Sequence, residues 1–150
     1  MPVANAVIMQ PSGGATTAII ADIAAAIASI DVLMYELTMV TIANALIAAK
    51  LRGLAIRVIL DAPQSRKFAS QKGALRAAGV PVWYDAKHQI MHSKYMIIDA
   101  VTIWHGSFNW SQAAESRNAE HVVKTTGDTG LVTAFQSDYS LHLAHSIAYP

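Results

Sequence analysis

A nucleophile, a fixed cation and several phosphate-binding groups occur in one short segment near the middle of the chain. They are His92 and Lys94, followed by Gly106, Ser107 and Asn109. In an extended strand, residues two apart share a face, so the His92 and Lys94 side chains are expected to project together. A neutral imidazole attacks phosphorus well at neutral pH, and a neighbouring ammonium neutralises charge that develops on the phosphate oxygens. This combination points to phosphodiester chemistry.

Asp99 follows Lys94 by five residues and therefore falls on the opposite face of the same strand. We expect its carboxylate to anchor the turn at Asp99-Ala100 or to pair with a structural cation, which makes Asp99 a support residue. Tyr95 also points away from Lys94. A place in the core is a better prediction for Tyr95 than a role as a catalytic phenol.

The spacing of these residues resembles the signature of the phospholipase D superfamily. That signature reads His, any residue, Lys, four residues, Asp, six residues, Gly-Ser, one residue and Asn, and every fixed position is present: His92, Lys94, Asp99, Gly106, Ser107 and Asn109. The likeness covers most of the chain through further segments: Tyr35-Glu36-Leu37-Thr38, Ala48 to Gly53, Val58 to Asp61 and Asn118-Ala119-Glu120. It is greatest towards the small bacterial endonucleases of the superfamily, which carry one motif per chain.

The resemblance implies roles for the residues of the motif and counts Asp99 among its catalytic residues, with support as its expected contribution. His92 becomes the nucleophile that forms a covalent phosphohistidine, with no metal and no other cofactor. Glu120 orients His92 by accepting its second ring N–H. Larger members of the superfamily build one site from two motifs, and this chain has one, so a homodimer that brings two His92 side chains to one pocket is expected. The groups implied to hold the phosphate are Lys94, Asn109, Ser107 and the Gly106 backbone.

Positive charge is concentrated in the middle of the chain, although the net charge of the whole chain is only +1. Between Lys50 and Lys94, nine basic residues are opposed only by Asp61 and Asp85. Such a run often does no more than solvate helix surfaces, but its position beside the His92 motif favours a polyanionic partner. We therefore expect nucleic acid as the partner, with DNA ahead of RNA, bound in a salt-sensitive manner.

Alternating helical and strand patterns predict the fold class. The pattern indicates helices at 19–30, 42–52, 66–78 and 129–146, a short helical or irregular segment at 111–116, and strands at 32–38, 55–60, 80–84, 101–105 and 119–126, with residues 87–91 leading into the strand that carries the motif. We find no internal duplication. The sequence thus predicts one α/β domain over residues 1–150, with a mixed β-sheet flanked by α-helices in the phospholipase D-like manner.

The remaining histidines carry weaker signals. His88, His105 and His121 have only their proximity to the motif to recommend them. His142 and His145 lie three apart on a predicted helix, a spacing that suits metal coordination. Because no nearby Asp, Glu or Cys completes a site there, we predict that no metal binds to this pair.

Two other features leave alternatives open. Trp104 and Trp110 flank the Gly106 segment, where their rings are able to stack on an unpaired base, although core packing is the better prediction for at least one of them. The apolar pair Met39-Val40 follows a predicted strand and departs from the resemblance. It indicates either an exposed patch or a dimer contact.

Composition excludes several classes of protein. The chain has no cysteine, which excludes disulfides, zinc ribbons and thiol catalysis. No uncharged apolar run reaches the roughly 18 residues of a membrane span, so stable membrane insertion is not expected. The chain as given lacks a recognisable signal peptide, and its compartment is left open. Similarity to small endonucleases that are often exported implies a periplasmic or secreted mature form.

Three functions are compatible with these observations. The leading one is a metal-independent phosphodiesterase that hydrolyses DNA with little sequence preference, with RNA as a further substrate left open. Phospholipid cleavage is the second, because a glycerophosphodiester presents the same reacting group to the same chemistry. The third is a nucleic-acid-binding module without turnover, against which the intact His92, Lys94, Asn109 and Glu120 argue.

Overall fold

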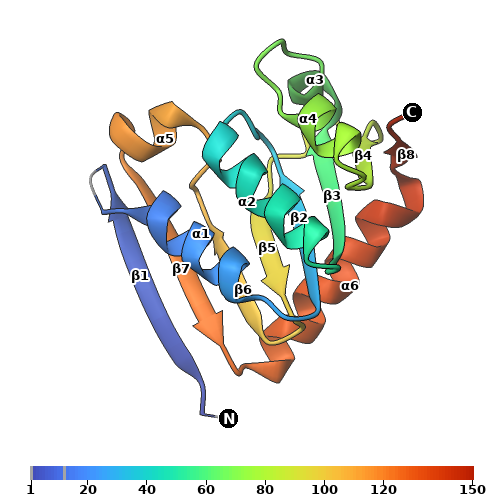
Figure 1. Ribbon diagram of the computed structural model, residues 1–150. Coiled ribbons are helices and arrows are strands. Elements are labelled where there is room, and N and C mark those ends of the chain that lie inside the picture. The colour runs from blue at the N-terminus through green and yellow to red at the C-terminus, as the bar shows by residue number, and fades with distance from the viewer. Residues whose placement is uncertain (1, 12) are drawn as a thin grey trace.

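The structure is a computed structural model that describes residues 2–11 and 13–150. Its strands are β1 (Ala4–Gln10), β2 (Ser29–Met34), β3 (Ala55–Asp61), β4 (Val82–Asp85), β5 (Lys94–Ile98), β6 (Thr102–Gly106), β7 (Glu120–Thr126) and β8 (Ile147–Ala148). Its helices are α1 (Ala15–Ala25), α2 (Val40–Leu51), α3 (Ala62–Ser65), α4 (Lys72–Ala77), α5 (Gln112–Ser116) and α6 (Thr129–His145). All strands join one sheet in the order β1-β7-β6-β5-β2-β3-β4-β8 (Figure 1).

The sheet is mixed because its two halves are connected differently. β2, β3 and β4 are parallel, and the helices between them return the chain to the same end of the sheet. β5, β6, β7 and β1 pair antiparallel, with a tight hairpin between β5 and β6. A mixed sheet flanked by helices is the predicted fold class, and the structure confirms it.

Helices cover both faces of the sheet, and each face has its own core. α1 and α2 lie on one face, where alternate residues of β2 such as Ile30 and Val32 are fully buried. α6 lies on the other face, where Val132 and Tyr139 pack against Leu33. Residues also alternate along β5. Lys94 is on the same face as Met96 and Ile98, which α1 and α2 cover, whereas Tyr95 faces α6.

The expected elements differ from the observed ones in several places. The helix expected at 19–30 ends at Ala25, and the strand expected at 32–38 is β2 at Ser29–Met34, so Ile30 lies in the sheet and not in a helix. The short strand β8 was not expected. Residues 66–78 do not form one helix, because the Gln71 amide donates to the Leu37 carbonyl oxygen (3.0 Å) and α4 begins only after this contact. The preceding helix α3 begins at residue 62, where the Asp61 carboxylate accepts from the Gln64 amide at 3.0 Å. The edge strand β1 was not expected, since most of its residues are exposed and their polarity does not alternate.

One edge of the sheet gathers the segments that carry the motif. We call it the site edge: β2 and β3 end there, β5 and β7 begin there, and it lies at the top of Figure 1. The Tyr35 amide donates to the Ser93 carbonyl oxygen (3.1 Å), and the Met91 amide donates to the Asp61 carboxylate (2.9 Å). These two bonds fix the loop that leads into β5 against the ends of β2 and β3. Among the described residues, no helix is both long and apolar enough to span a bilayer.

Candidate active site

His92 and Lys94 meet at the site edge, as the two-residue spacing predicts. Lys94 is the first residue of β5 and only 8% exposed, whereas His92 precedes the strand and is exposed. The Lys94 Nζ atom lies 3.2 Å from His92 Nδ1 and 2.5 Å from the His92 carbonyl oxygen. The strand therefore holds a buried ammonium directly beside an accessible imidazole.

This contact determines which ring nitrogen of His92 carries a proton in the free chain. An ammonium has donors and no acceptor, so Nδ1 must accept from Lys94 when the imidazole is neutral. Burial lowers the pKa of Lys94, and the negative charge of Glu120 acts in the opposite direction. The proton of a neutral His92 then resides on Nε2.

Tyr35 forms one wall of the site, and sequence reasoning assigned it no role. Its ring contacts the His92 ring edge-on, with centroids 4.6 Å apart, and the Lys94 ammonium lies 5.1 Å from the Tyr35 centroid. The Gln64 side chain of α3 donates to the Tyr35 hydroxyl at 2.6 Å. An aromatic face beside a cation stabilises its charge, so Tyr35 holds both Lys94 and His92 in place.

Gly106, Ser107 and Glu120 form a corner between β6 and β7. Gly106 has φ +154°, and a Cβ there would collide with the His121 carbonyl oxygen and approach Val122 Cα to 3.0 Å. Only glycine allows this close approach. The Ser107 hydroxyl donates to Glu120 and accepts from the His121 amide at 3.1 Å.

Glu120 therefore differs in its contacts from the role that the family resemblance implies. Its carboxylate accepts from Ser107 and, at 3.2 Å, from the Asn118 side chain. Among the described residues it forms no hydrogen bond with His92. Within one chain, Glu120 acts on the site through Ser107 and through its charge on Lys94.

Asn109 lies between two buried aromatic residues. Trp110 and Phe108 belong to the core, and the Trp110 carbonyl oxygen accepts from the Thr38 and Met39 amides at 3.0 Å each. The Asn109 side-chain oxygen is buried and has no hydrogen-bond partner among the described residues. A buried acceptor without a partner is costly, so Asn109 Oδ1 remains open to a hydrogen-bond donor.

Asp99 lies at the opposite end of β5, roughly 17 Å along the strand from Lys94. Its carboxylate accepts from the backbone amides of Ile27 (3.0 Å), Ala28 (2.8 Å) and Ser29 (2.9 Å). Burial raises the pKa of Asp99, but these three bonds outweigh it, and the pKa is lowered. The geometry is that of the expected anchor: Asp99 ties the β5–β6 turn to the start of β2 and does not reach His92 or Lys94.

The other aromatic and apolar residues of interest are mostly structural. Trp104 and Trp110 are both buried, which agrees with core packing. Met39 is also buried, and its sulfur accepts from the Thr16 hydroxyl at 3.3 Å, so the expected exposed patch is reduced to Val40, which is 55% exposed. Tyr95 is buried with its hydroxyl donating to Asp138 at 2.8 Å, a core position as predicted.

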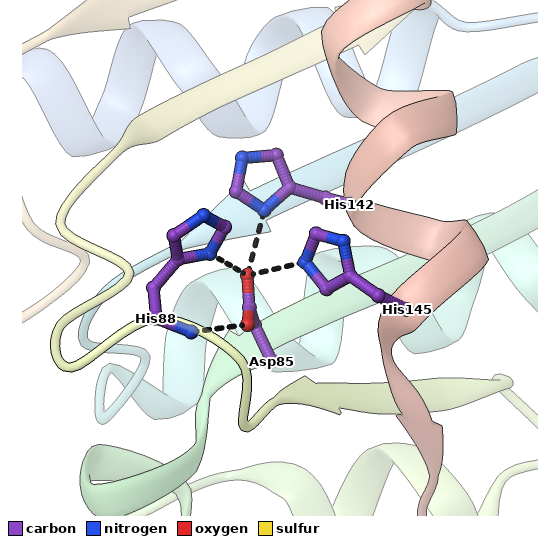
Figure 2. A group of neighbouring side chains, drawn as sticks. All are labelled: Asp85, His88, His142 and His145. Atoms are coloured by element: carbon purple, nitrogen blue, oxygen red, sulfur yellow. Dashed lines mark hydrogen bonds and ion pairs between the residues drawn. The ribbon is translucent and has the colours of Figure 1, made fainter.

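The histidines outside the motif divide into two groups. His105 packs against Phe135 on the α6 face, and burial together with the charge of His121 lowers its pKa. The expectation that no acidic residue accompanies His142 and His145 is wrong. Figure 2 shows both rings, together with His88, directed at one carboxylate, that of Asp85. Sequence reasoning missed this group because Asp85 is 57 residues from His142.

The basic middle segment also divides in two. Arg52 donates to the Ile23 and Ala26 carbonyl oxygens at the end of α1, and Arg57 pairs with Asp31 at 2.7 Å, so these two cations are structural. Loops of the site edge hold three other basic residues of this segment, Arg66, Lys67 and Lys87, and also Arg117 from outside it; none of these four forms a salt bridge within residues 2–11 and 13–150.

Comparison with known proteins agrees with this geometry. Residues 19–141 match the family described as "Cardiolipin synthase, PLD-like domain". The chain is 32% identical to the mitochondrial cardiolipin hydrolase of Xenopus tropicalis over 111 residues, which cover 74% of this chain and 52% of that protein. It is 36% identical to the phospholipase D of Rickettsia felis over 113 residues, which cover 75% and 56%. The chain thus spans about half the length of these curated relatives.

A solved structure resembles the chain over its whole length. Nuc, a phospholipase D family member from Salmonella typhimurium, superposes with a TM-score of 0.94 at 29% identity and covers 99% of each chain. The likeness therefore includes both faces of the sheet and the site edge. The family match, the curated relatives and this structure all lead to one assignment: the chain belongs to the phospholipase D superfamily.

Proposed function

We propose that the protein is a metal-independent phosphodiesterase that hydrolyses DNA through a phosphohistidine intermediate, at a site shared by two chains. The observation that carries the proposal is the exposed His92 imidazole held 3.2 Å from the buried Lys94 ammonium. A nucleophile and a charge stabiliser at this distance fit one phosphate group between them. The family membership of the chain supports the same chemistry.

The first chemical step transfers the phosphoryl group to His92. Substrate phosphate draws Lys94 onto a nonbridging oxygen, which frees Nδ1 to hold the ring proton and gives Nε2 a lone pair. Nε2 attacks phosphorus, and an N–P bond forms as the bond to the leaving oxygen breaks. The leaving oxygen takes its proton from the partner subunit's His92, acting as general acid. The Asn109 NH₂ group adds donors to the phosphate oxygens, and the Ser107 hydroxyl adds another when its proton turns from Glu120 to the phosphate.

The second step releases the phosphate and restores the enzyme. The partner subunit's His92, now neutral, removes a proton from water, and the resulting oxygen nucleophile attacks phosphorus. The N–P bond breaks, a phosphomonoester leaves, and both rings return to their starting protonation states. Two identical residues thus supply the nucleophile and the acid, which is why a chain with one motif needs a second copy.

Exposed apolar side chains in segments of the site edge support a second copy there. Ile90 is 55% exposed two residues before His92, and Phe68 is wholly exposed in the loop after α3. Val40 adds a third apolar group at the start of α2. Apolar groups left in water at one edge gain free energy when a symmetric partner covers them.

DNA is the preferred substrate because of the cations around the site. Arg66, Lys67, Lys87 and Arg117 lie in loops of the site edge without a salt bridge within residues 2–11 and 13–150. Several cations in loops suit successive phosphates of a polynucleotide better than the single phosphodiester of a lipid. RNA presents the same backbone charge, so it is a substrate to be tested alongside DNA.

Phospholipid cleavage is the second candidate, and a specific observation favours it. The curated relatives are named cardiolipin hydrolase and phospholipase D. The exposed Phe68 and Ile90 side chains suit an acyl surface as well as a protein partner. Binding of nucleic acid without turnover is the third candidate, which the intact pair of His92 and Lys94 disfavours.

The experiment that tests the proposal is nicking of supercoiled plasmid in excess chelator, with an RNA and a fluorescent phospholipid as parallel substrates. The wild-type chain is compared with His92→Ala and with the matched control His105→Gln, whose side chain packs against Phe135 on the α6 face of the sheet. The assay is run at a temperature at which circular dichroism shows each chelated protein to be folded. We expect nicking by the wild type and the control only. Turnover of lipid alone would contradict the nuclease proposal and favour a phospholipase. Inactivity on every substrate would favour a nucleic-acid-binding module without turnover.

A further inference from the structure

A second polar cluster lies on the α6 face, away from His92. Asp85 ends β4, His88 follows in the next loop, and His142 and His145 are on the last turns of α6. Their ligand atoms all lie within 4.8 Å of one another (Figure 2). His88 Nδ1, His142 Nδ1 and His145 Nε2 are 2.8, 2.7 and 3.0 Å from the same oxygen, Asp85 Oδ2.

We propose that Asp85, His88, His142 and His145 form a structural site for a divalent transition metal ion of the zinc class. Three imidazoles and one carboxylate are a ligand set that tetrahedral Zn²⁺ accepts. Four protein ligands leave no open coordination position, which is typical of structural sites and not of catalytic ones. The cluster lies outside the His-Lys motif, and the proposed phosphodiesterase chemistry does not use it.

Hydrogen bonding within the protein does not account well for this arrangement. One carboxylate oxygen has about two lone pairs, so three ring N–H donors exceed what Asp85 Oδ2 is able to accept. The other oxygen, Oδ1, already accepts from the Lys87 amide (2.9 Å) and the His88 amide (3.2 Å). These backbone bonds aim Oδ2 at the rings. A cation at their centre would give each imidazole nitrogen and Oδ2 one partner.

The distances are close to those that a metal needs. With metal–ligand bonds of about 2.0–2.2 Å, tetrahedral ligand atoms are roughly 3.3 Å apart. The three nitrogen–oxygen separations of 2.7–3.0 Å are shorter than this by a few tenths of an ångström. The Asp85 side chain is fully buried, while 13% of His142 and 21% of His145 is exposed, so the ion is enclosed yet has a route of entry. A cavity of about 430 Å³ borders the three histidines.

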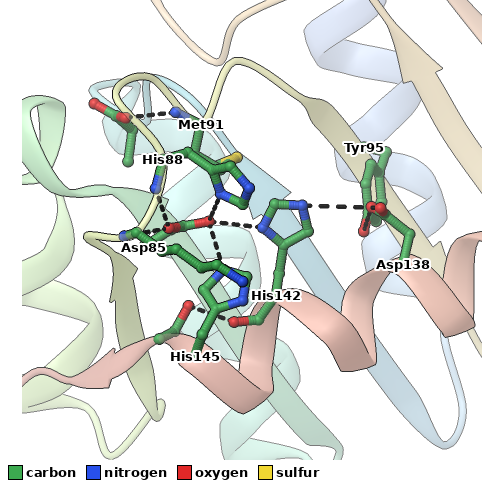
Figure 3. Close-up of polar contacts among 10 residues, drawn as sticks. Asp85, His88, Met91, Tyr95, Asp138, His142 and His145 are labelled. Carbon is green, nitrogen blue, oxygen red and sulfur yellow. Dashed lines mark hydrogen bonds and ion pairs between the residues drawn. The ribbon is translucent and has the colours of Figure 1, made fainter.

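An outer layer of contacts supports the ligands. Figure 3 shows Asp138 between His142 and Tyr95, and its Oδ1 atom lies 3.8 Å from His142 Nε2. The Tyr95 hydroxyl holds the other carboxylate oxygen at 2.8 Å. A carboxylate behind a ligating histidine orients the ring and raises its basicity, as in many zinc sites. At 3.8 Å the contact is an ion-pair separation and not a hydrogen bond, so a small shift of the ring towards Asp138 would complete this support when an ion binds.

Binding of the ion would fix the loop that carries the nucleophile. His88 lies four residues before His92, and the loop between β4 and β5 has only a few bonds to the rest of the sheet edge, among them that of the Met91 amide. A metal ion would tie this loop to α6. We therefore expect metal binding to raise the melting temperature and to slow amide exchange in residues 86–93.

The test is metal binding by the full chain after removal of metal with chelator. Zn²⁺ is added in a calorimetric titration, and Co²⁺ is used as an optical probe because tetrahedral Co²⁺ absorbs much more strongly than octahedral Co²⁺. We expect one ion per chain and a tetrahedral Co²⁺ spectrum that Zn²⁺ abolishes. The His142→Gln/His145→Gln double variant should lose both signals. His92→Ala, which removes a histidine outside the cluster, should keep them.

Two results would overturn the site: a wild-type chain that binds less than one Zn²⁺ at stoichiometric concentration, or a folded double variant that still binds one. Should the double variant not fold, Asp138→Asn decides the question, because it leaves every ligand in place. We expect it to weaken Zn²⁺ binding by about 10- to 100-fold, and unchanged affinity would exclude the site. Plasmid nicking by folded, metal-free protein is independent of these outcomes, so the metal site and the phosphodiesterase activity are tested separately.

Discussion

Replacing Asp99 by Asn tests whether the acidic residue of the motif is an anchor or a catalytic group. Asn fits the positive φ of 52° at this position, so the backbone is not strained. Its oxygen is able to keep the bonds from Ala28 and Ser29, but its amide group faces the Ile27 amide, and that bond is lost. Two of the three bonds are exposed to solvent, which reduces their value.

The expected loss follows from these contacts. Hydrogen bonds to a charged group contribute about 1.5–3 kcal/mol and neutral ones about 0.5–1.5 kcal/mol. The variant loses one bond, and the other two bonds no longer have a charged acceptor. After allowance for their exposure to solvent, the free energy of unfolding should fall by roughly 2–3 kcal/mol. At this chain length that lowers the melting temperature by about 4–12 °C.

The pH dependence of this difference gives a second check. The pKa of Asp99 in the folded chain is lower than its ordinary value of 3.8. The carboxylate's contribution is therefore complete only well above the unfolded pKa of 3.8 and disappears as pH falls through the lower folded pKa. We expect urea titrations of wild type and Asp99→Asn to differ fully at pH 7 and to converge in acid. A variant of unchanged stability that has lost plasmid nicking would refute the anchor role.

Three further predictions concern the site edge. Gly106→Ala should destabilise the chain by at least about 2 kcal/mol in chemical denaturation, because its Cβ would meet the His121 carbonyl oxygen; full stability would mean that the corner is not closely packed. Lys94→Met should lower the nicking rate by about 10²- to 10³-fold in a folded chain, and a rate within threefold of wild type would remove Lys94 from the chemistry. Lys67→Ala should reduce the salt slope of DNA binding by about 1, measured by fluorescence anisotropy, whereas Arg57→Ala should not, since Arg57 is paired with Asp31; equal effects would count against a localised DNA surface.

The sequence predicted those parts of the site whose residues are close together in the chain. His92 and Lys94 are only two residues apart, so local extended backbone brings them together although β5 begins at Lys94, and the Asp99 anchor follows from the alternation along β5. The strands and helices with strong periodicity were also predicted, because their apolar residues must face one core. The single helix expected at 66–78 does not form because a tertiary hydrogen bond, from the Gln71 amide to the Leu37 carbonyl oxygen, interrupts it.

Contacts between residues that are far apart in the chain could not be predicted from the sequence. Tyr35 lies beside His92 only because β2 and β5 are neighbours in the sheet. Asp85 meets His142 only because α6 crosses the sheet behind the end of β4. No local sequence pattern around Tyr35 or Asp85 predicts these contacts. The spacing of His142 and His145 did signal coordination, but the missing carboxylate came from another element.

The most direct test of the shared active site is the activity of a heterodimer with one intact chain and one His92→Ala chain. Two affinity tags, one on each chain, allow the heterodimer to be purified after co-expression. If each reaction needs both His92 residues, its plasmid nicking should fall to the level of the His92→Ala homodimer. A heterodimer of an intact chain and a His105→Gln chain should keep full activity. Activity at about half that of the wild type, the value for two independent sites, would contradict the account, as would a fully active monomer in sedimentation.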